Sequence, residues 1–343
     1  MTATRPPSHP SRHSADSDLH PFATFIRILG RGPGGSRSLT MDEAETAMAM
    51  ICAGTAEPLQ IGALMALLRY RSETPAELAG MVQALRATIN RPAGSPTPDL
   101  DWPTYASGGK RGRPWFVLSA LLVAETGIRV FMHSDDSQGH ESAAARALTA
   151  LGLPPVTNAI EAGASLTRHG LAFMPLSSIC PQLQKLIALR RMLGLRTAAN
   201  TVARLLNPFE APHLIQGVFH PPYRSLQQEA AALLGQPRSA VFKGGRGEAE
   251  RPPHKNCEVF SVDQGRLDCE TWPALRPESE AVSAESTHLL SLWRGDVQDD
   301  HATALVVGSA AVAFRLLGQA ASPAEADALA NDHWQRRNRD RFS

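Results

Sequence analysis

The apolar residues in the first part of the chain recur every three or four positions, which is the spacing of amphipathic helices. Two of these segments begin with a capping box, in which a threonine is followed three residues later by a glutamate, and another begins with a proline. The pattern predicts helices over residues 22–29, 40–51, 58–71 and 74–89. We therefore expect a small all-helical domain at 21–95, after a disordered tail at 1–20.

A stretch rich in Pro, Gly and Ser at 91–98 ends this pattern, and short apolar runs then alternate with helical segments. The runs that predict strands are 102–106, 129–133, 171–176, 214–219, 240–243 and 259–262. The segments that predict helices are 117–125, 142–151, 183–193, 226–234 and 303–317. Such alternation is typical of an α/β fold with a mostly parallel sheet covered by helices.

Two glycine-rich, basic loops follow predicted strands, one near residue 108 and the other near residue 245. Ligands bind at the carboxyl ends of strands in open α/β sheets, and glycines let backbone N–H groups approach an anion closely. The pair of loops predicts an anion-binding cleft, and the alternative is two ordinary solvated turns. The residues assigned to this cleft are Ser107, Gly108, Gly109, Lys110, Arg111, Lys243 and Arg246.

The overall charge makes these loops more conspicuous. The 343 residues carry 34 basic and 33 acidic side chains, a formal net charge of +1, which excludes a globally polycationic nucleic-acid coat. Lysine occurs at four positions, and two of them, Lys110 and Lys243, fall in the two loops. Any affinity for nucleic acid must therefore come from a local patch.

Other features narrow the class of protein. The four cysteines form no C-x-x-C pair, the N-terminal residues contain no apolar signal segment, and no run of about 18 apolar residues occurs. We expect a cytoplasmic protein that does not enter a membrane. Asp135 and Asp136 follow a predicted strand and are interpreted either as a metal or base site or as a polar turn.

Several segments resemble the anthranilate phosphoribosyltransferase family (glycosyltransferase family 3), to which pyrimidine-nucleoside phosphorylases are related. They are LTMDEA at 39–44, QIGALMALLR at 60–69, ETPAELAG at 73–80, RRMLGLRT at 190–197, LNP at 206–208 and AAVA at 310–313. The resemblance runs in order along residues 22–335. It implies a helical domain of 21–95 with helices from 173–206, an α/β domain of 96–172 and 207–337, and a homodimer.

Two donor-site motifs of that family are altered in this chain. The family's donor loop, G-T-G-G-D, falls on residues 106–110, where two glycines remain and Lys110 replaces the acid. The N-x-S-T motif, which holds phosphate and metal in the family, falls on residues 116–119 and ends in Ser119. A cation has thus taken the place of an acid and its metal, and a cation attracts phosphate directly.

Other family positions are kept in part. His133 is what remains of a K-H-G-N-R segment at 132–136, and Glu250 is what remains of a metal-binding Asp-Glu pair. Arg190 matches the arginine associated with the carboxylate of the aromatic acceptor. The resemblance therefore implies a residual donor site of Ser119, His133 and Glu250, with Glu250 as its remaining metal ligand, and an acceptor contact at Arg190.

Three functions remain open, and whether the protein is an enzyme is one of the open points. The altered motifs resemble a divergent, anthranilate phosphoribosyltransferase-like branch whose members bind nucleic acid. The first function is accordingly the binding of single-stranded nucleic acid or a phosphate-rich small molecule, with Tyr105, Trp115 and Phe116 as the available stacking faces. The second is a pentosyltransferase with an altered donor or acceptor, for which Mg²⁺ is the expected cofactor. The third is a structural partner with a vestigial cleft.

Overall fold

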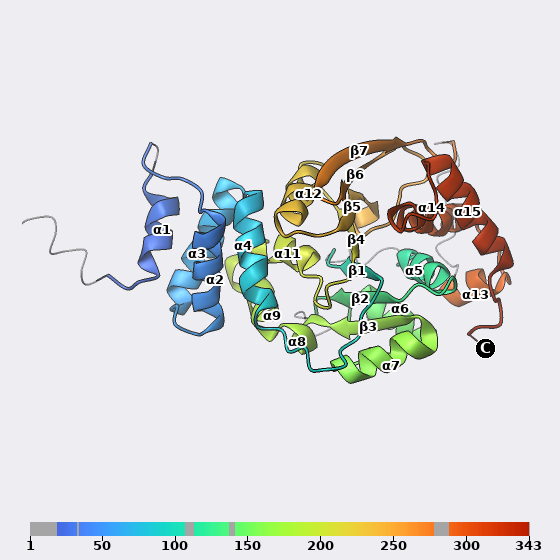
Figure 1. Ribbon diagram of the computed structural model, residues 1–343, viewed down its shortest axis with the longest axis horizontal. Helices are drawn as coiled ribbons and strands as arrows, with labels where there is room; N and C mark the ends of the chain where they lie inside the picture. The colour runs from blue at the N-terminus through green and yellow to red at the C-terminus, as the bar shows by residue number, and fades with distance from the viewer. Residues whose placement is uncertain (1–18, 33, 107–112, 137–140, 278–287, 343) are drawn as a thin grey trace, which may run out of the picture.

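The computed structural model describes residues 19–32, 34–106, 113–136, 141–277 and 288–342. A helical unit lies at one end of the molecule, a twisted sheet lies in the middle, and the last long helices lie at the other end (Figure 1). None of the helices in these ranges is long and apolar enough to cross a membrane.

The helical unit is built around capped, amphipathic segments. Its first helices are α1 (Ala23–Gly30), α2 (Met41–Cys52), α3 (Pro58–Arg71) and α4 (Pro75–Arg86). Both predicted capping boxes are confirmed, because Thr40 and Thr74 accept bonds from the N–H groups of Glu43 and Glu77, and each glutamate accepts one in return. The carboxylate of Glu77 also accepts a bond from Leu39 N at 2.9 Å, which fixes the start of α2 against α4.

Short helices from the middle of the chain pack on this unit. They are α8 (Leu176–Ile179), α9 (Pro181–Ala188), α10 (Arg190–Leu193) and α11 (Ala198–Val202), and the 3-10 turn η1 (Ala203–Leu205) follows them. Buried side chains of α9 and α11 belong to the same apolar cluster as those of α2 and α4. Arg86 of α4 donates to the carbonyl oxygens of Leu205 and Leu206 at 2.9 and 2.7 Å, so the last turn of α4 is tied to the chain that enters the sheet.

The described residues form one seven-stranded sheet of order β3-β2-β1-β4-β5-β6-β7. The strands are β1 (Leu100–Thr104), β2 (Val130–Ser134), β3 (Leu171–Pro175), β4 (His213–Val218), β5 (Arg238–Lys243), β6 (Cys257–Asp263) and β7 (Arg266–Trp272). The first five strands pair in parallel, whereas β6 and β7 are antiparallel to their neighbours. The expected α/β class with a mostly parallel sheet is confirmed.

Helices cover both faces of the sheet (Figure 1). The remaining ones are α5 (Phe116–Ala124), α6 (Ala143–Ala150), α7 (Ala159–His169), α12 (Tyr223–Leu233), α13 (Leu289–Arg294), α14 (Asp300–Leu316) and α15 (Pro323–Arg336). The helix α12 packs against β5, β6 and β7 on the side of the helical unit, and α5 and α14 form the other layer. The carboxyl ends of the parallel strands thus open beside the helical unit.

Among the described glycines of α1–α4, Gly80 has the least space for a side chain, because α4 packs closely against α2 there. A Cβ atom on Gly80 would lie 2.1 Å from the carbonyl oxygen of Met41, and that oxygen is part of the backbone and cannot rotate away. Gly62, in the middle of α3, has no atom within 4 Å of the same position. The two glycines therefore differ in their tolerance for a methyl group.

We predict that Gly80→Ala destabilises the protein by about 1–3 kcal/mol, the usual cost of overpacking a closed interface. Gly62→Ala is the matched control and should be neutral or stabilising by up to about 1 kcal/mol, because alanine is the better helix former. Urea unfolding followed by circular dichroism measures both changes. Equal effects of the two substitutions would contradict the close approach of α2 and α4.

Candidate anion-binding site

The loop after β5 folds back onto the end of β4. A Cβ on Gly217 of β4 would lie 2.0 Å from the carbonyl carbon of Glu248, and a Cβ on Gly244 would lie 1.6 Å from the Glu248 carbonyl oxygen. Both positions therefore require glycine. The loop contains the 3-10 turn η2 (Gly245–Gly247), in which Arg246 takes a left-handed conformation with φ of 57°.

Two carboxyl groups of this loop reach across to the segment that follows β1. Glu248 Oε1 accepts a hydrogen bond from Ala106 N at 3.0 Å, and Glu250 Oε2 accepts one from Phe116 N at 3.3 Å. Phe116 is the first residue of α5, and a helix N-terminus is a ready-made site for an anion. The carboxyl group of Glu250 therefore occupies a position that suits a phosphate.

Burial changes the acidity of both groups. Loss of solvent raises the pKa of Glu248 to about 8, although nearby Arg204 and the bond from Ala106 act in the opposite direction. Loss of solvent also raises the pKa of Glu250 to about 7, opposed by Arg246. Both carboxyl groups therefore change charge near neutral pH.

Three arginines surround a cavity of about 90 Å³ beside these carboxyl groups. They come from different elements: Arg69 from α3, Arg196 from the segment before α11, and Arg204 from η1. His220 and Tyr223, which follow β4, line the same cavity. The site thus lies where the helical unit meets the carboxyl end of the sheet.

Arg204 is the most deeply placed of the three, with 7% of its surface exposed. Its Nε donates to Gly217 O at 3.0 Å and its Nη1 to Asn200 O at 2.8 Å. Burial lowers the pKa of Arg204 to about 10, so the side chain stays charged at neutral pH. Arg69 Nη1 donates to the Tyr223 hydroxyl at 2.6 Å.

The cavity also holds polar atoms whose bonding capacity is unused. Thr197 Oγ1, Asn200 Oδ1 and Gln227 Oε1 line it, are buried, and have no hydrogen-bond partner within the described ranges. Buried polar atoms are nearly always bonded to something in a folded protein. A ligand or ordered water in this cavity would satisfy them.

The prediction that Tyr105, Trp115 and Phe116 offer stacking faces is wrong, and Phe219 is the exposed aromatic residue near the cavity. Tyr105, Trp115 and Phe116 are 3%, 5% and 3% exposed, so no base can lie on them. Trp115 and Phe116 belong to one buried apolar cluster, and Tyr105 belongs to the other. Phe219 is 55% exposed and its ring centroid is 4.8 Å from that of His220, at the rim of the arginine cavity.

The structure describes three more of the predicted site residues, and five others lie outside the described ranges. Lys243, at the end of β5, and Arg246 have exposed side chains in the loop near the cavity. Arg190 is half-buried on α10. The pKa of Arg196 is lowered mainly by burial and to a smaller extent by the positive charge of Arg190. Ser107, Gly108, Gly109, Lys110 and Arg111 lie outside the described residues.

His133 and Ser119 lie in the interior rather than in the cleft. His133 is fully buried, with Nδ1 2.6 Å from the Tyr105 hydroxyl and Nε2 3.2 Å from Asp101 Oδ2. The buried Ser119 hydroxyl donates to Val306 O of α14 at 2.9 Å. Both side chains are therefore already bonded within the protein.

Each of the two carboxyl groups of the loop after β5 lies near an arginine. Burial raises the pKa of both carboxyl groups and so favours their protonated forms. Arg204 acts against this rise at Glu248, and Arg246 acts against it at Glu250. A protonated carboxyl group is a weak ligand for a hard cation. In the described ranges, no three His, Cys, Asp or Glu side chains form a group that could hold a metal ion.

Family profiles match almost the whole of this arrangement. The profile described as "Glycosyl transferase family, a/b domain" matches residues 116–336, and the one described as "Glycosyl transferase family, helical bundle domain" matches residues 23–89. The chain belongs to this glycosyl transferase family. The matched ranges contain α1–α4, the helices that cover the sheet and every strand except β1, so the resemblance to anthranilate phosphoribosyltransferases is confirmed at the level of the family.

The relatives of this chain include enzymes and a protein described as uncharacterized. The chain is 30% identical to an anthranilate phosphoribosyltransferase of Methylocella silvestris over 70% of this chain and 68% of that protein. It is 27% identical to the uncharacterized protein YbiB of Escherichia coli over 71% of this chain and 77% of that one.

Solved structures of the family have the same fold. The anthranilate phosphoribosyltransferase of Thermus thermophilus superposes with a TM-score of 0.76 at 24% identity, covering 92% of this chain and 94% of that one. The Saccharomyces cerevisiae enzyme, solved in complex with PRPP and Mg, superposes with a TM-score of 0.71 at 14% identity, covering 94% and 96%.

The raised pKa values of Glu248 and Glu250 predict how stability varies with pH. Each group holds its proton more tightly when folded than at its usual value of 4.5, so its contribution is complete below about pH 4.5 and is lost as pH rises towards 7–8. The double variant Glu248→Gln, Glu250→Gln should lose this part of the decline. Chemical unfolding from pH 5 to pH 8.5 measures it, and identical pH profiles of variant and parent would contradict the burial of these carboxyl groups.

Proposed function

We propose that this glycosyl transferase family member binds a phosphate-rich ligand, foremost single-stranded nucleic acid, and that its site for phosphoribosyl pyrophosphate and Mg²⁺ is weakened. The observation that carries the proposal is the group of Arg69, Arg196 and Arg204 around one small cavity. Their planar guanidinium groups suit the oxygens of a phosphate, which they bind through paired, charge-assisted hydrogen bonds.

The size of the cavity supports a single phosphate group as its occupant. A volume of about 90 Å³ equals roughly three water molecules at ~30 Å³ each, too little for a whole nucleotide. The rest of a ligand would therefore extend outwards, past Phe219 and towards Lys243 and Arg246. A chain of linked phosphates with attached bases has this shape.

The contacts at the N-terminus of α5 and at Ser119 support a weakened site for phosphoribosyl pyrophosphate. The N-terminus of α5 is occupied by Glu250, and the Ser119 hydroxyl is bonded to Val306 in the core. A pyrophosphate at that helix end would have to displace a carboxyl group and would meet its charge. Losing several phosphate and metal contacts costs a transferase several kcal/mol of transition-state stabilisation.

We also infer that the protein forms a homodimer through the outer face of the helical unit. Leu59 and Tyr70 of α3 and Met192 of α10 are large apolar side chains of the helical unit that are 86%, 88% and 83% exposed, and a dimer interface would remove such side chains from water. The mass of the protein in solution, measured by light scattering, decides between monomer and dimer.

We predict that Arg196→Ala lowers the affinity for a fluorescent thymidine oligonucleotide about tenfold, because one charge-assisted phosphate contact is lost. The plot of log affinity against log salt concentration should become shallower by about 0.7, the value per contact for single strands. Arg336→Ala is the matched control, since Arg336 is 79% exposed on the distant helix α15. Fluorescence anisotropy measures both, and equal behaviour of the two variants would contradict the site.

The same titration tests the role of the exposed aromatic ring. Phe219→Ala should weaken oligonucleotide binding by about 1–3 kcal/mol, the value of stacking one base, and leave the affinity for inorganic polyphosphate unchanged. Absence of any salt-dependent binding to nucleic acid would overturn the proposed function. A Phe219→Ala loss with both ligands would show that the ring shapes the cavity instead of stacking on a base.

The second candidate function is transfer of a pentosyl group to an aromatic carboxylate. It is favoured by the half-buried Arg190, which lies close enough to Arg196 to lower its pKa. Under the main proposal, we predict turnover of phosphoribosyl pyrophosphate and anthranilate well below about 1 per second with saturating Mg²⁺. Fluorescence of the product measures this rate. Turnover at ordinary enzyme rates, lost in Arg190→Ala, would put the transferase function first.

A further inference from the structure

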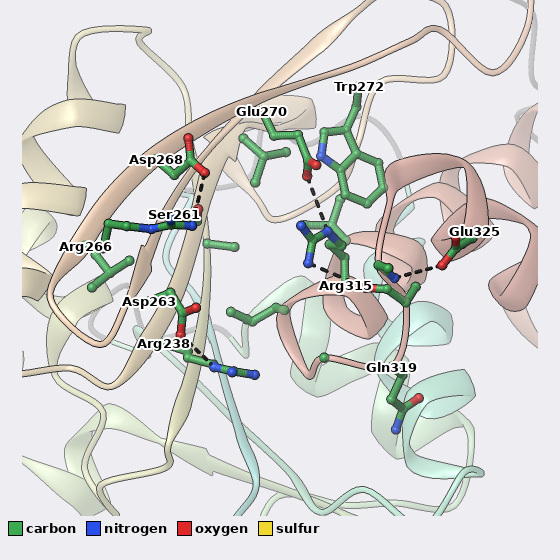
Figure 2. A pocket seen from close by; sticks show the side chains of 18 residues that line it. Arg238, Ser261, Asp263, Arg266, Asp268, Glu270, Trp272, Arg315, Gln319 and Glu325 are labelled. Atoms are coloured by element: carbon green, nitrogen blue, oxygen red, sulfur yellow. Dashed lines mark hydrogen bonds and ion pairs between the residues drawn. The ribbon is translucent and has the colours of Figure 1, made fainter.

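A second and larger cavity lies at the opposite end of the sheet. Its volume is about 400 Å³, within the range of small-molecule sites, and it lies between β5, β6 and β7 on one side and the last turn of α14 on the other (Figure 2). Arg238, the first residue of β5, lines it, whereas Val218, the last residue of the neighbouring strand β4, lines the arginine cavity. The two cavities are therefore separated by the length of a strand.

The floor of this cavity is apolar. Val259 of β6, Trp272 of β7 and Val312 and Leu316 of α14 contribute it, and all four are buried. Such a surface favours an apolar group about the size of an amino-acid side chain, because binding would remove the apolar area of that group from water.

The rim carries charges of both signs. Arg238 pairs with Asp263 at 3.0 Å, Arg315 with Glu270 at 3.6 Å, and Arg266 with Asp268 at 3.8 Å. With Glu325, the lining contains three arginines and four carboxyl groups, so its formal charge is −1. This balance disfavours a phosphate chain and suits a molecule that carries one positive and one negative group.

Two buried N–H donors in the lining have no hydrogen-bond partner within the described residues, and one of them, Arg315 Nε, is the atom that forms the 3.6 Å ion pair with Glu270. They are Nε1 of Trp272, whose side chain is fully buried, and Nε of Arg315. Figure 2 shows both side chains on the same side of the cavity, with the Glu270 carboxylate drawn between them. A buried donor without a hydrogen bond is unfavourable, and a ligand oxygen would supply the missing bond.

We propose that this cavity binds a free α-amino acid with an apolar side chain. Its carboxylate would accept bonds from Trp272 Nε1 and Arg315 Nε, its ammonium group would donate to Glu270, and its side chain would lie on Val259 and Val312. This proposal is independent of the proposed function, because the two cavities share no residue and lie at opposite ends of the strands.

The test follows the indole N–H signal of Trp272 by two-dimensional NMR of the full-length ¹⁵N-labelled protein. The chain has five tryptophans, and the Trp272→Phe variant identifies this signal by its loss. L-Phenylalanine at millimolar concentration should shift the signal saturably. Glycine, which lacks the side chain, phenethylamine, which lacks the carboxylate, and 3-phenylpropionate, which lacks the ammonium group, should each shift it much less.

Two variants test the charged contacts. Glu270→Gln and Arg315→Gln should each weaken L-phenylalanine binding about tenfold, the effect of losing one charge-assisted contact. Asp300→Asn is the matched control, since Asp300 is 77% exposed and pairs with Arg276 away from the floor of the cavity. No saturable shift with L-phenylalanine, or equal shifts with the three truncated compounds, would overturn the proposal, and so would unchanged affinity in both variants.

Discussion

The buried guanidinium group of Arg204 is the interaction on which the site depends. A charge with 7% of its surface exposed is costly unless hydrogen bonds and an opposite charge compensate for it. Backbone oxygens of Gly217 and Asn200 supply the bonds, and Glu248 lies close enough to oppose the lowering of the Arg204 pKa by burial. These groups belong to the sheet, to α11 and to the loop after β5, so one cation holds three parts of the cleft together.

The remaining geometry follows from this requirement. Glu248 reaches Arg204 only because the loop after β5 lies directly on β4, and this close approach needs glycine at 217 and 244. The same loop places Glu250 at the N-terminus of α5. The chain thus keeps the fold of its glycosyl transferase family, with a carboxyl group of its own at the N-terminus of α5 and three arginines at the contact with the helical unit.

The sequence predicted local structure well where the signals are local. Thr40 and Thr74 begin helices because their capping partners lie three residues away. β7 was not predicted, because this edge strand has exposed residues on both faces and therefore no apolar alternation. α7 and α15 were not predicted either, although Asn158 and Ser322 cap them.

The candidate site was predictable only in part. Glycine loops at strand ends predicted a site at the carboxyl end of the sheet, where the arginine cavity also lies, and the first of these loops is outside the described residues. Arg69, Arg196 and Arg204 stand on separate elements, and a pattern along the chain cannot show that they meet. His133 and Ser119 matched family motifs by position, but the direction of a side chain depends on packing, and both turn inwards.

A crystal structure of the protein grown with a short thymidine oligonucleotide tests the site most directly. We expect one phosphate of the oligonucleotide in the cavity between Arg69, Arg196 and Arg204, bonded to their guanidinium groups, with an adjoining base against Phe219. An oligonucleotide bound elsewhere on the surface, with only water among the three arginines, would contradict it.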